Sequence, residues 1–404
     1  MGDLTIGLIR EGKTPPDKRV AFTPAQAEEI IQRFAGVNVV VEQSDIRAFT
    51  DDEYKARGVR VTTDLSECDV LMGIKEVPIA QLIRNKTYFF FSHTLKKQPY
   101  NRNLLQEILR KNITLIDYEA LRDRHGNRLV AFGRYAGIVG AYNALWTYGQ
   151  RYKGFALRRA HECFDVNDLK RELRKVELPP IKIVLTGSGR VGRGAMETLD
   201  TANIRKVSPE EFLHQTFDEP VYVQLSSADY HRRKEGGAFN RDEFHRYPDR
   251  YVSTFGSFMT VCDMLIAGAF WNPSAPVLFT REDMQRPDFR IKVVADITCD
   301  INGSIPSTKR ASTITDPLYD YDPAADKVKA PLSGEKLVTV MAIDNLPCEL
   351  PRSASEEFGR DLIDRILPVM LGPDHEGVID RATITRDGSL TKHFAYLEDY
   401  VRGE

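Results

Sequence analysis

A glycine-rich turn in the middle of the chain is the clearest sign of chemistry in this sequence. An apolar run, Ile181–Thr186, leads directly into Gly187-Ser188-Gly189-Arg190-Val191-Gly192 and then into a helical pattern. In such a strand, turn and helix, the first glycine permits the tight turn, the second lets the backbone approach a pyrophosphate, and the third allows close packing of helix on strand. The phosphates lie at the positive end of the helix. The pattern predicts a dinucleotide site at these six residues, and the alternative is a structural glycine turn in an α/β domain.

A lysine and a histidine follow two apolar segments upstream of that turn. Lys75 comes after the strand expected at Val70–Met72, and His93 comes after the strand expected at Tyr88–Phe91. If the two strands are neighbours, both side chains face one cleft. Histidine titrates nearest to neutrality, and a partly desolvated lysine beside other cations has a lowered pKa, so the pair can move protons at an imine or amine. A surface lysine and a capping histidine remain the alternative at this point.

Several cations follow the first expected strand, in the segment from Arg10 to Pro24. Arginine suits the binding of carboxylates because its planar fork donates two parallel hydrogen bonds. Arg19 and Lys13 lie in this segment, and Glu119 and Arg128 lie beyond a later strand. For each charge taken singly, an ion pair or a solvated loop is the alternative.

The residues after the glycine turn leave the dinucleotide's identity open. An acid that binds the adenosine ribose is expected about 20 residues past the glycines, at the end of the next strand. We place that strand at Ala202–Val207, and it is followed by Ser208, with Arg205 and Lys206 close by and the acids Glu210 and Glu211 slightly late. Serine with nearby cations tolerates a 2′-phosphate, so both NAD and NADP remain candidates.

Alternating strands and helices position these residues, and they predict a parallel α/β sheet over residues 4–133. Thr23 is expected to cap the helix that begins at Pro24. The expected strands are Leu4–Ile9, Val37–Glu42, Val70–Ile74, Tyr88–Phe91 and Thr114–Asp117, and the expected helices are Pro24–Phe34, Asp51–Arg57 and Asn101–Lys111.

The second half of the chain is predicted to form the nucleotide domain. A helix over Tyr135–Tyr148 leads into it, and a polar, aromatic-rich segment near residues 216–255 is interpreted as an insertion. Asp300 follows a strand expected at Ile291–Ile297, and another strand is expected at Leu337–Ile343. Ligands of open α/β sheets bind at such strand ends. Ser355–Leu371 is expected to form a closing helix, and Ala382–Phe394 a short terminal piece.

Length and composition bound the class of protein. The 404 residues are enough for two domains, which would flank a cleft. A net charge of −2 favours neither nucleic acid nor an anionic membrane, so we expect small-molecule partners. Five cysteines without Cys-x-x-Cys spacing suggest neither disulfides nor a zinc site, and no stretch approaches the roughly 18 apolar residues of a membrane span. We therefore expect a soluble, cytoplasmic protein without a metal, and no feature predicts its oligomeric state.

Together these motifs resemble the alanine dehydrogenase and saccharopine dehydrogenase superfamily over nearly the whole chain. The order is Arg-Glu-x-Lys and Arg-x-Ala-x-Thr-Pro within Arg10–Pro24, Gly-x-Lys-Glu at Gly73–Glu76, Phe-x-His at Phe91–His93, and then the glycine turn. Four longer segments are similar to the lysine-forming saccharopine dehydrogenases, and more so to the lysine–oxoglutarate reductase half of the bifunctional lysine-degrading enzyme. These segments are Tyr88–Lys96, Leu115–Glu119, Arg128–Gly137 and Ile343–Pro351.

The resemblance implies an α/β fold of two Rossmann-like domains with parallel sheets flanking a central cleft. It implies a substrate domain of residues 1–133 plus 345–404 and a dinucleotide-binding domain of residues 134–344, with the insertion near 216–255. It also implies reversible conversion of saccharopine to lysine and 2-oxoglutarate with NAD or NADP. Lys75 would take the proton of the secondary amine, and His93 would serve the water that hydrolyses the imine. The implied substrate partners are Arg19, Arg128, Glu76, Glu119, Lys96 and Lys13, with Glu76 and Glu119 tuning the catalytic pair.

Two other functions remain open at this stage. An alanine dehydrogenase would turn over pyruvate and ammonia, although its sequence differs from Val130–Gly137 of this chain. A dinucleotide sensor without catalysis would need only the glycine turn, so the presence of Lys75, His93, Arg19 and Arg128 favours an enzyme.

Overall fold

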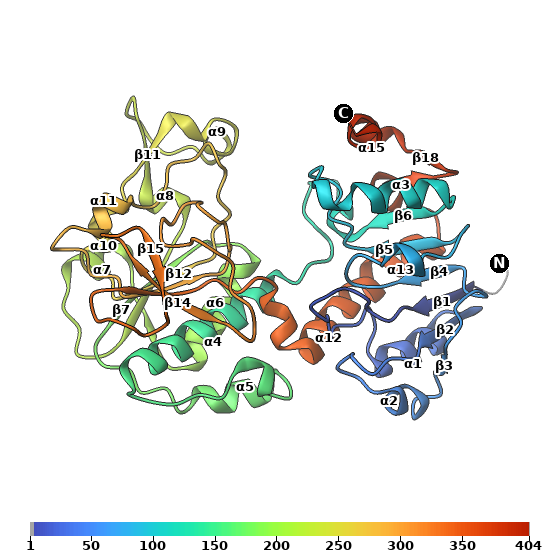
Figure 1. Cartoon of the computed structure of the whole chain (residues 1–404), viewed down its shortest axis with the longest axis horizontal. Helices are drawn as coiled ribbons and strands as arrows, with labels where there is room; N and C mark the ends of the chain where they lie inside the picture. Colours follow the sequence, from blue (N-terminus) through green and yellow to red (C-terminus); the bar gives the residue numbers. More distant parts are fainter. Residues whose placement is uncertain (1–3, 404) are drawn as a thin grey trace. The chain divides into compact units, whose positions relative to one another are not determined.

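The computed structural model describes residues 4–403, which divide into two compact units (Figure 1). The first unit contains residues 4–132 and 351–403, and the second contains residues 133–350. Each unit is an α/β domain built around one eight-stranded, mostly parallel sheet. The fold is therefore the predicted pair of Rossmann-like α/β domains.

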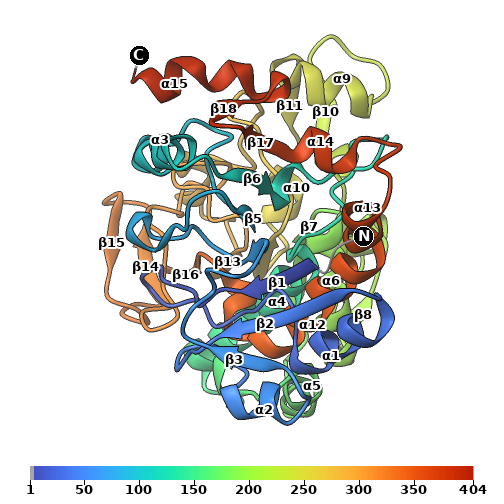
Figure 2. The ribbon, with the colours of Figure 1, turned by 90° about the vertical axis from the view of Figure 1, so that its right-hand side faces the viewer.

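The sheet of the first unit has the order β18-β17-β6-β5-β4-β1-β2-β3. The strands β1 to β6 run parallel, and β17 from the C-terminal segment joins the edge strand β6 in the antiparallel sense, as the red and cyan strands of Figure 2 show. The bounds are β1 Leu4–Leu8, β2 Val37–Glu42, β3 Arg60–Thr62, β4 Val70–Met72, β5 Thr87–Phe90, β6 Thr114–Asp117, β17 Thr383–Arg386 and β18 Ser389–Leu390. The strands predicted for residues 4–133 are confirmed, while β3 and β17 were not predicted.

Helices of the first unit also begin where the sequence indicates. Thr23 caps α1 with a reciprocal pair of hydrogen bonds to Gln26, and Pro24 is its first residue. The predicted closing helix forms as α12 and α13 joined by one π-helical turn, and it buries Phe358, Leu362 and Ile366 in the core of this unit. The bounds are α1 Pro24–Arg33, α2 Asp51–Lys55, α3 Arg102–Arg110, α12 Pro351–Asp361, α13 Leu367–Leu371, α14 Val378–Ala382 and α15 Glu398–Arg402.

The sheet of the second unit has the order β15-β14-β16-β13-β12-β7-β9-β8. Strands β16 to β8 in this order are parallel, and β14 and β15 extend the sheet in the antiparallel sense. The bounds are β7 Lys182–Thr186, β8 Arg205–Lys206, β9 Val221–Leu225, β12 Met264–Ala267, β13 Val293–Asp296, β14 Leu318–Asp322, β15 Lys327–Lys329 and β16 Val338–Met341. A separate hairpin pairs β10 His231–Arg233 with β11 Tyr251–Ser253.

Two helices of the second unit cross at very short distance. A Cβ atom on Gly137 of α4 would lie 1.9 Å from the carbonyl oxygen of Val191 in α6. Likewise, a Cβ atom on Gly194 of α6 would lie 2.0 Å from the carbonyl oxygen of Arg134 in α4. Only glycine allows the two backbones this approach. The helices of this unit are α4 Gly133–Tyr152, α5 Val166–Leu173, α6 Arg190–Thr201, α7 Pro209–His214, α8 Ser227–Tyr230, α9 Arg241–Arg246, α10 Gly256–Met259 and α11 Arg281–Met284.

The strand predicted after the glycine turn is shorter than expected and lies at the edge of the sheet. We expected a strand at Ala202–Val207, but only Arg205–Lys206 is a strand, and it pairs with β9. The strand beside β7 is β9. The physical reason is burial, since the apolar β9 is almost fully buried and the exposed β8 is left at the edge. The segment interpreted as an insertion therefore contains a central strand, and the additional structure begins after Leu225.

No helix among residues 4–403 has both the length and the apolar character that a membrane span requires.

Candidate active site

The glycine turn of the second unit has the geometry that phosphate binding needs. Gly187 has a φ of +104°, and a Cβ on Gly192 would lie 2.2 Å from the carbonyl oxygen of Gly187. Gly189 is the N-cap of α6, and the space where its Cβ would be is open. A pyrophosphate can thus approach the start of the twelve-residue helix α6.

Side chains of the same turn pack against its neighbours. A Cβ atom added to Gly133 would lie 3.1 Å from the Cβ atom of Arg190. A Cβ atom added to Gly268 would lie 2.9 Å from a methyl group of Val191. Ser188 is exposed. The proposed contacts of these three side chains with a cofactor stay predictions.

Ser208 and Asp300, the other two predicted cofactor residues, follow strands on opposite sides of β7 in the second sheet. Ser208 follows the edge strand β8 and caps α7, accepting a hydrogen bond of 3.2 Å from the backbone N–H of Glu211. Asp300 lies in the loop after β13, and its carbonyl oxygen accepts the N–H of Gly303. Both strands lie two places from β7, with β9 between β7 and β8 and β12 between β7 and β13.

Lys75 and His93 follow adjacent parallel strands of the first unit, as predicted. Met72 of β4 pairs in register with Phe89 of β5, so both chains leave the sheet at the same edge. The residue that joins them is Glu76, whose side chain is only 9% exposed. The three residues therefore belong to one cluster at the carboxyl end of β4 and β5.

Glu76 is hydrogen-bonded by three side chains. Its Oε1 lies 2.7 Å from Nδ1 of His93 and accepts from the Asn101 amide at 3.2 Å, and its Oε2 accepts from Nζ of Lys13 at 2.8 Å. Burial raises the pKa of Glu76, but the hydrogen bonds from His93 and Lys13 outweigh it, so the pKa lies well below its ordinary value. Glu76 is therefore an ionised acceptor, the Nδ1 of His93 carries a proton, and Nε2 is the atom left to exchange one.

The backbone at His93 is held in an unusual conformation. His93 has a φ of +51°, in the left-handed region. Its neighbour Ser92 donates both its N–H and its hydroxyl to the buried carboxylate of Asp117, at 2.8 and 2.5 Å, and its hydroxyl lies 2.8 Å from that of Thr94. These hydrogen bonds fix the turn, which directs the His93 ring toward Glu76.

Lys75 has no carboxylate partner, in contrast to Lys13, Arg19 and Arg128. Among residues 4–403, no side chain pairs with its Nζ, and the residue is half-buried. Burial lowers the pKa of Lys75, and the positive charges of Arg19 and Lys13 lower it further. The amine of Lys75 is therefore neutral in a larger fraction of molecules than an ordinary lysine, as a proton acceptor requires.

Glu11, for which the sequence predicted no role, positions the Lys75 loop. Its side chain is buried and accepts the backbone N–H of Ile74 at 2.6 Å and that of Lys75 at 2.9 Å. Burial, with the nearby charge of Asp17, raises the pKa of Glu11 to about 8. The only sequence signal was its place in the Arg-Glu-x-Lys motif, directly after the first strand.

The predicted substrate-binding cations fall into different settings. Arg19 is 3% exposed and makes two hydrogen bonds to Asp17, at 3.0 and 2.5 Å, with its guanidinium 4.1 Å from the ring centre of Phe132. Arg128 is 40% exposed and pairs with Glu119. Lys13 pairs with Glu76, and Lys96 is exposed. Arg19 thus lies in the wall of the site, while Arg128 and Lys96 are accessible to a ligand.

The first unit therefore offers two different proton-exchanging groups beside a set of cations. One is a half-buried amine of lowered pKa, and the other is an imidazole oriented by an ionised carboxylate. Such a pair can serve two successive proton transfers at a nitrogen-bearing carbon, with carboxylates of the same molecule held by arginine and lysine.

Comparison with known proteins agrees with this arrangement. Residues 7–139 match the family described as alanine dehydrogenase/PNT, N-terminal domain. The chain is 32% identical to the mitochondrial alpha-aminoadipic semialdehyde synthase of Mus musculus, over 97% of this chain and 47% of that protein. It is 28% identical to the saccharopine dehydrogenase [NAD(+), L-lysine-forming] of Neurospora crassa, over 90% of this chain and 91% of that protein. The chain thus spans about half the length of the first of these relatives.

Solved structures show the same fold. An L-alanine dehydrogenase aligns with a TM-score of 0.67 at 16% identity, covering 99% of both chains. A transhydrogenase from Sinorhizobium meliloti aligns with a TM-score of 0.61 at 16% identity, covering 96% of this chain and 98% of that one.

The first unit therefore contains a domain of the alanine dehydrogenase/PNT N-terminal family, and the fold of the chain is that of the solved L-alanine dehydrogenase. The similarity to a saccharopine dehydrogenase over 90% of this chain supports a relationship with amino-acid dehydrogenases.

Proposed function

We propose that this chain catalyses the reversible oxidation of saccharopine to L-lysine and 2-oxoglutarate with a nicotinamide dinucleotide. The observation that carries the proposal is the cluster of Lys75, Glu76 and His93 at two adjacent strand ends. The similarity to a lysine-forming saccharopine dehydrogenase over 90% of the chain supports it.

In the oxidative direction, Lys75 takes the proton of the secondary amine while the neighbouring carbon loses a hydride. Its lowered pKa suits this role, because a base must be unprotonated before it acts. The bound nicotinamide supplies the hydride acceptor. The product of this step is an imine between the two halves of the substrate.

His93 then serves the hydrolysis of the imine. Because Nδ1 donates to Glu76, Nε2 of the neutral ring accepts a proton from the water that adds to the imine carbon. Nε2 then returns that proton to the nitrogen, and a second proton passes from the new hydroxyl group to the same nitrogen as the C–N bond breaks, which releases lysine and 2-oxoglutarate. Two separate groups are needed, since the first step requires a base at nitrogen and the second a base at water.

Carboxylate recognition falls to the exposed cations. Saccharopine has three carboxylates, and Arg128 and Lys96 are accessible to them. We assign Arg19, whose guanidinium is engaged by Asp17, to the electrostatics of the site, where its charge keeps the pKa of Lys75 low. Glu119 holds the Arg128 guanidinium in place.

The test is a spectrophotometric assay at 340 nm with purified protein, L-lysine and 2-oxoglutarate, run separately with NADH and NADPH. Consumption of the reduced dinucleotide that requires both organic substrates supports the proposal, and saccharopine is identified in the mixture by mass spectrometry. A control with pyruvate and ammonia tests the alanine dehydrogenase reaction. Turnover with that pair alone, or with neither pair, would overturn the proposal.

A further inference from the structure

Asn101 occupies the N-cap position of α3 and is 6% exposed. Asparagine is among the residues most favoured at this position, where its side-chain oxygen accepts a backbone N–H of the first helical turn. Within residues 4–403 the Asn101 side chain forms no such cap. The buried amide therefore makes its hydrogen bonds with other parts of the first unit.

The amide nitrogen of Asn101 donates into the candidate active site. It donates to Oε1 of Glu76 at 3.2 Å and to the carbonyl oxygen of Ser92 at 3.0 Å. Both partners can only accept, so the nitrogen and not the oxygen of the amide must face them. Asn101 thus connects the carboxylate that bonds to the His93 ring with the residue that precedes His93 in the chain.

On the side of Glu76, Asn101 and His93 share one oxygen atom. Oε1 of Glu76 lies 2.7 Å from Nδ1 of His93 and also accepts from Asn101, whereas Oε2 accepts from Lys13 at 2.8 Å. Rotation of the carboxylate away from His93 would break the hydrogen bonds to Asn101 and Lys13. The two donors therefore hold both ends of the carboxylate and keep Oε1 at the His93 ring.

On the backbone side, Asn101 fixes the peptide group that joins Ser92 to His93. Asn101 holds the carbonyl group of Ser92, and Asp117 holds its N–H and its hydroxyl. His93 has a φ of +51°, a conformation that persists only where the surroundings impose it. Asn101 and Asp117 together supply this constraint on the turn.

The arrangement determines where the neutral His93 ring carries its proton. A neutral imidazole has one proton, on Nδ1 or on Nε2, and the partner of one nitrogen decides which atom bears it. With Glu76 as the acceptor, the proton lies on Nδ1. If the carboxylate or the turn moves, this hydrogen bond weakens and a fraction of the rings carries the proton on Nε2. Such rings cannot accept a proton from water at Nε2.

We propose that Asn101 is a positioning residue for the hydrolysis step, because it holds Glu76 and the Ser92–His93 peptide in the arrangement that leaves Nε2 of His93 free to accept a proton. The assignment to that step rests on the proposed function, whereas the effect on the His93 ring does not. Lys75 is held through its backbone N–H by Glu11, so the removal of the amine proton should not depend on Asn101.

The first measurement concerns the His93 ring and needs neither cofactor nor substrate. Protein that contains histidine labelled with nitrogen-15 is studied by NMR at about pH 9, well above the ordinary histidine pKa of about 6.5. The chemical shifts of the two ring nitrogens report which of them carries the proton. The chain has eight histidines, and a His93→Gln variant identifies the signals of His93. We expect the proton on Nδ1 in the wild type and shared between the two nitrogens in Asn101→Leu.

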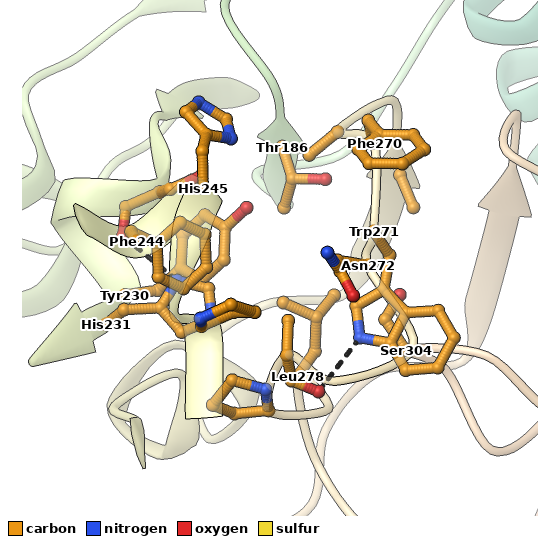
Figure 3. Close-up of a pocket in the computed structure, with 16 residues that line it drawn as sticks. Thr186, Tyr230, His231, Phe244, His245, Phe270, Trp271, Asn272, Leu278 and Ser304 are labelled. Atoms are coloured by element: carbon orange, nitrogen blue, oxygen red, sulfur yellow. Dashed lines mark hydrogen bonds between the residues drawn. The ribbon is translucent and has the colours of Figure 1, made fainter. Parts of the chain in front are cut away.

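His231 of the second unit is an internal reference for this measurement. Figure 3 shows His231 beside Tyr230 and Phe244, with ring centres 4.6 Å apart in both pairs. Its Nδ1 donates to the carbonyl oxygen of Ser227 at 3.0 Å, and burial lowers the pKa of His231. This ring is therefore neutral at pH 9 with its proton on Nδ1. Its signals should be the same in every variant.

The chain offers a matched control for the substitution. Asn103 is an exposed asparagine two residues further along α3, so Asn103→Leu makes the same chemical change outside the site. Asn101→Ala removes the same two donors as Asn101→Leu without adding bulk, and agreement between these variants excludes crowding as the cause. Melting temperatures of all variants verify that they are folded.

The second measurement separates the two chemical steps of saccharopine oxidation. Stopped-flow absorbance at 340 nm records the first turnover, in which the substrate loses a hydride, and a steady-state assay records the whole cycle. We expect Asn101→Leu to lower kcat about tenfold, a part of what a positioned acid–base group contributes, while the first-turnover rate constant stays within about twofold of the wild type. Asn103→Leu should change neither.

Each result decides a separate point. An unchanged His93 proton in both Asn101 variants, or the same change in Asn103→Leu, would overturn the proposal whatever the activity. Equal losses in the first turnover and in kcat would overturn the assignment to the hydrolysis step. If the wild type does not oxidise saccharopine, the proposed function fails, and the NMR result still decides whether Asn101 positions the His93 ring.

Discussion

Replacing Glu11 with glutamine is expected to change the way in which stability depends on pH. The Glu11 carboxyl is buried, and burial together with the charge of Asp17 raises its pKa to about 8. An acid whose pKa is raised in the folded state contributes stability that is fully present below its unfolded pKa and is lost as the pH rises to its folded pKa. For Glu11 this window runs from about pH 4.5 to about pH 8.

The size of the effect follows from the same two values. At about 1.4 kcal/mol for each pH unit, the window corresponds to a loss of about 5 kcal/mol of unfolding free energy in the wild-type protein. Glutamine does not titrate, so the variant lacks this slope. Its amide group replaces one of the two oxygens that accept the N–H groups of Ile74 and Lys75, which costs about 1–3 kcal/mol at every pH. The variant should be the less stable protein at pH 5 and the equal or more stable one at pH 9.

The assay is urea unfolding of the wild type and Glu11→Gln at pH 5, 7 and 9. Far-UV circular dichroism follows both units, whereas tryptophan fluorescence follows the second unit alone, because Trp146 and Trp271 both belong to it. The fluorescence transition should be unaffected by the substitution. Glu67→Gln is the control, since Glu67 is an exposed glutamate of the same unit. Parallel pH dependence of the wild type and Glu11→Gln would refute the reasoning that Glu11 holds a proton in the folded state.

Three further predictions concern the two sites. Lys75→Met should lower turnover by at least about 100-fold, as expected when an acid–base group is removed, while the dinucleotide affinity measured by calorimetry stays unchanged. Normal turnover of this variant would exclude Lys75 as the base. Lys18→Met is the control, because Lys18 is exposed. Lys13→Met removes a cation that lowers the pKa of Lys75, so the acid limb of kcat/KM for saccharopine oxidation should move about half a pH unit upward; a shift in the other direction would contradict this. Gly189→Ala should retain the wild-type melting temperature, because the space that the added Cβ would occupy is open. The same Cβ should weaken NADH binding at least about tenfold, because it blocks the approach of the pyrophosphate. Unchanged affinity for NADH would place the phosphates elsewhere.

The first sheet was predictable because each of its elements carries a local signal. Apolar runs such as Val37–Glu42 alternate with amphipathic segments, and Thr23 followed by Pro24 marks a helix start by capping alone. Placement of Lys75 and His93 at adjacent strand ends then followed from the rule that sequential strands tend to be neighbours. The antiparallel addition of β17 was not predictable, since it depends on a segment about 270 residues away from its partner β6.

The same rule failed in the second sheet. Arg205–Lys206 follows the glycine turn and its helix, so sequence order favoured it as the neighbour of β7. In the structure the inner position belongs to β9, whose residues Val221, Tyr222 and Val223 are fully buried. Competition between two candidate strands is decided by the apolar surface that each can bury, and this depends on the whole sheet. The hydrogen-bond partners of Glu76 were not predictable for a similar reason, because they come from three separate segments.

The different tasks of Lys75 and His93 follow from where the single carboxylate of the cluster makes its hydrogen bonds. Glu76 bonds to His93 and Lys13 and leaves Lys75 without an anionic partner. An ion pair would have stabilised the charged form of Lys75, whereas burial and the charges of Arg19 and Lys13 favour its neutral form. The same carboxylate fixes the proton of His93 on Nδ1 and leaves Nε2 for a water molecule. One buried glutamate thus separates a base for nitrogen from a base for water, and its position depends on the loop that Glu11 holds in place.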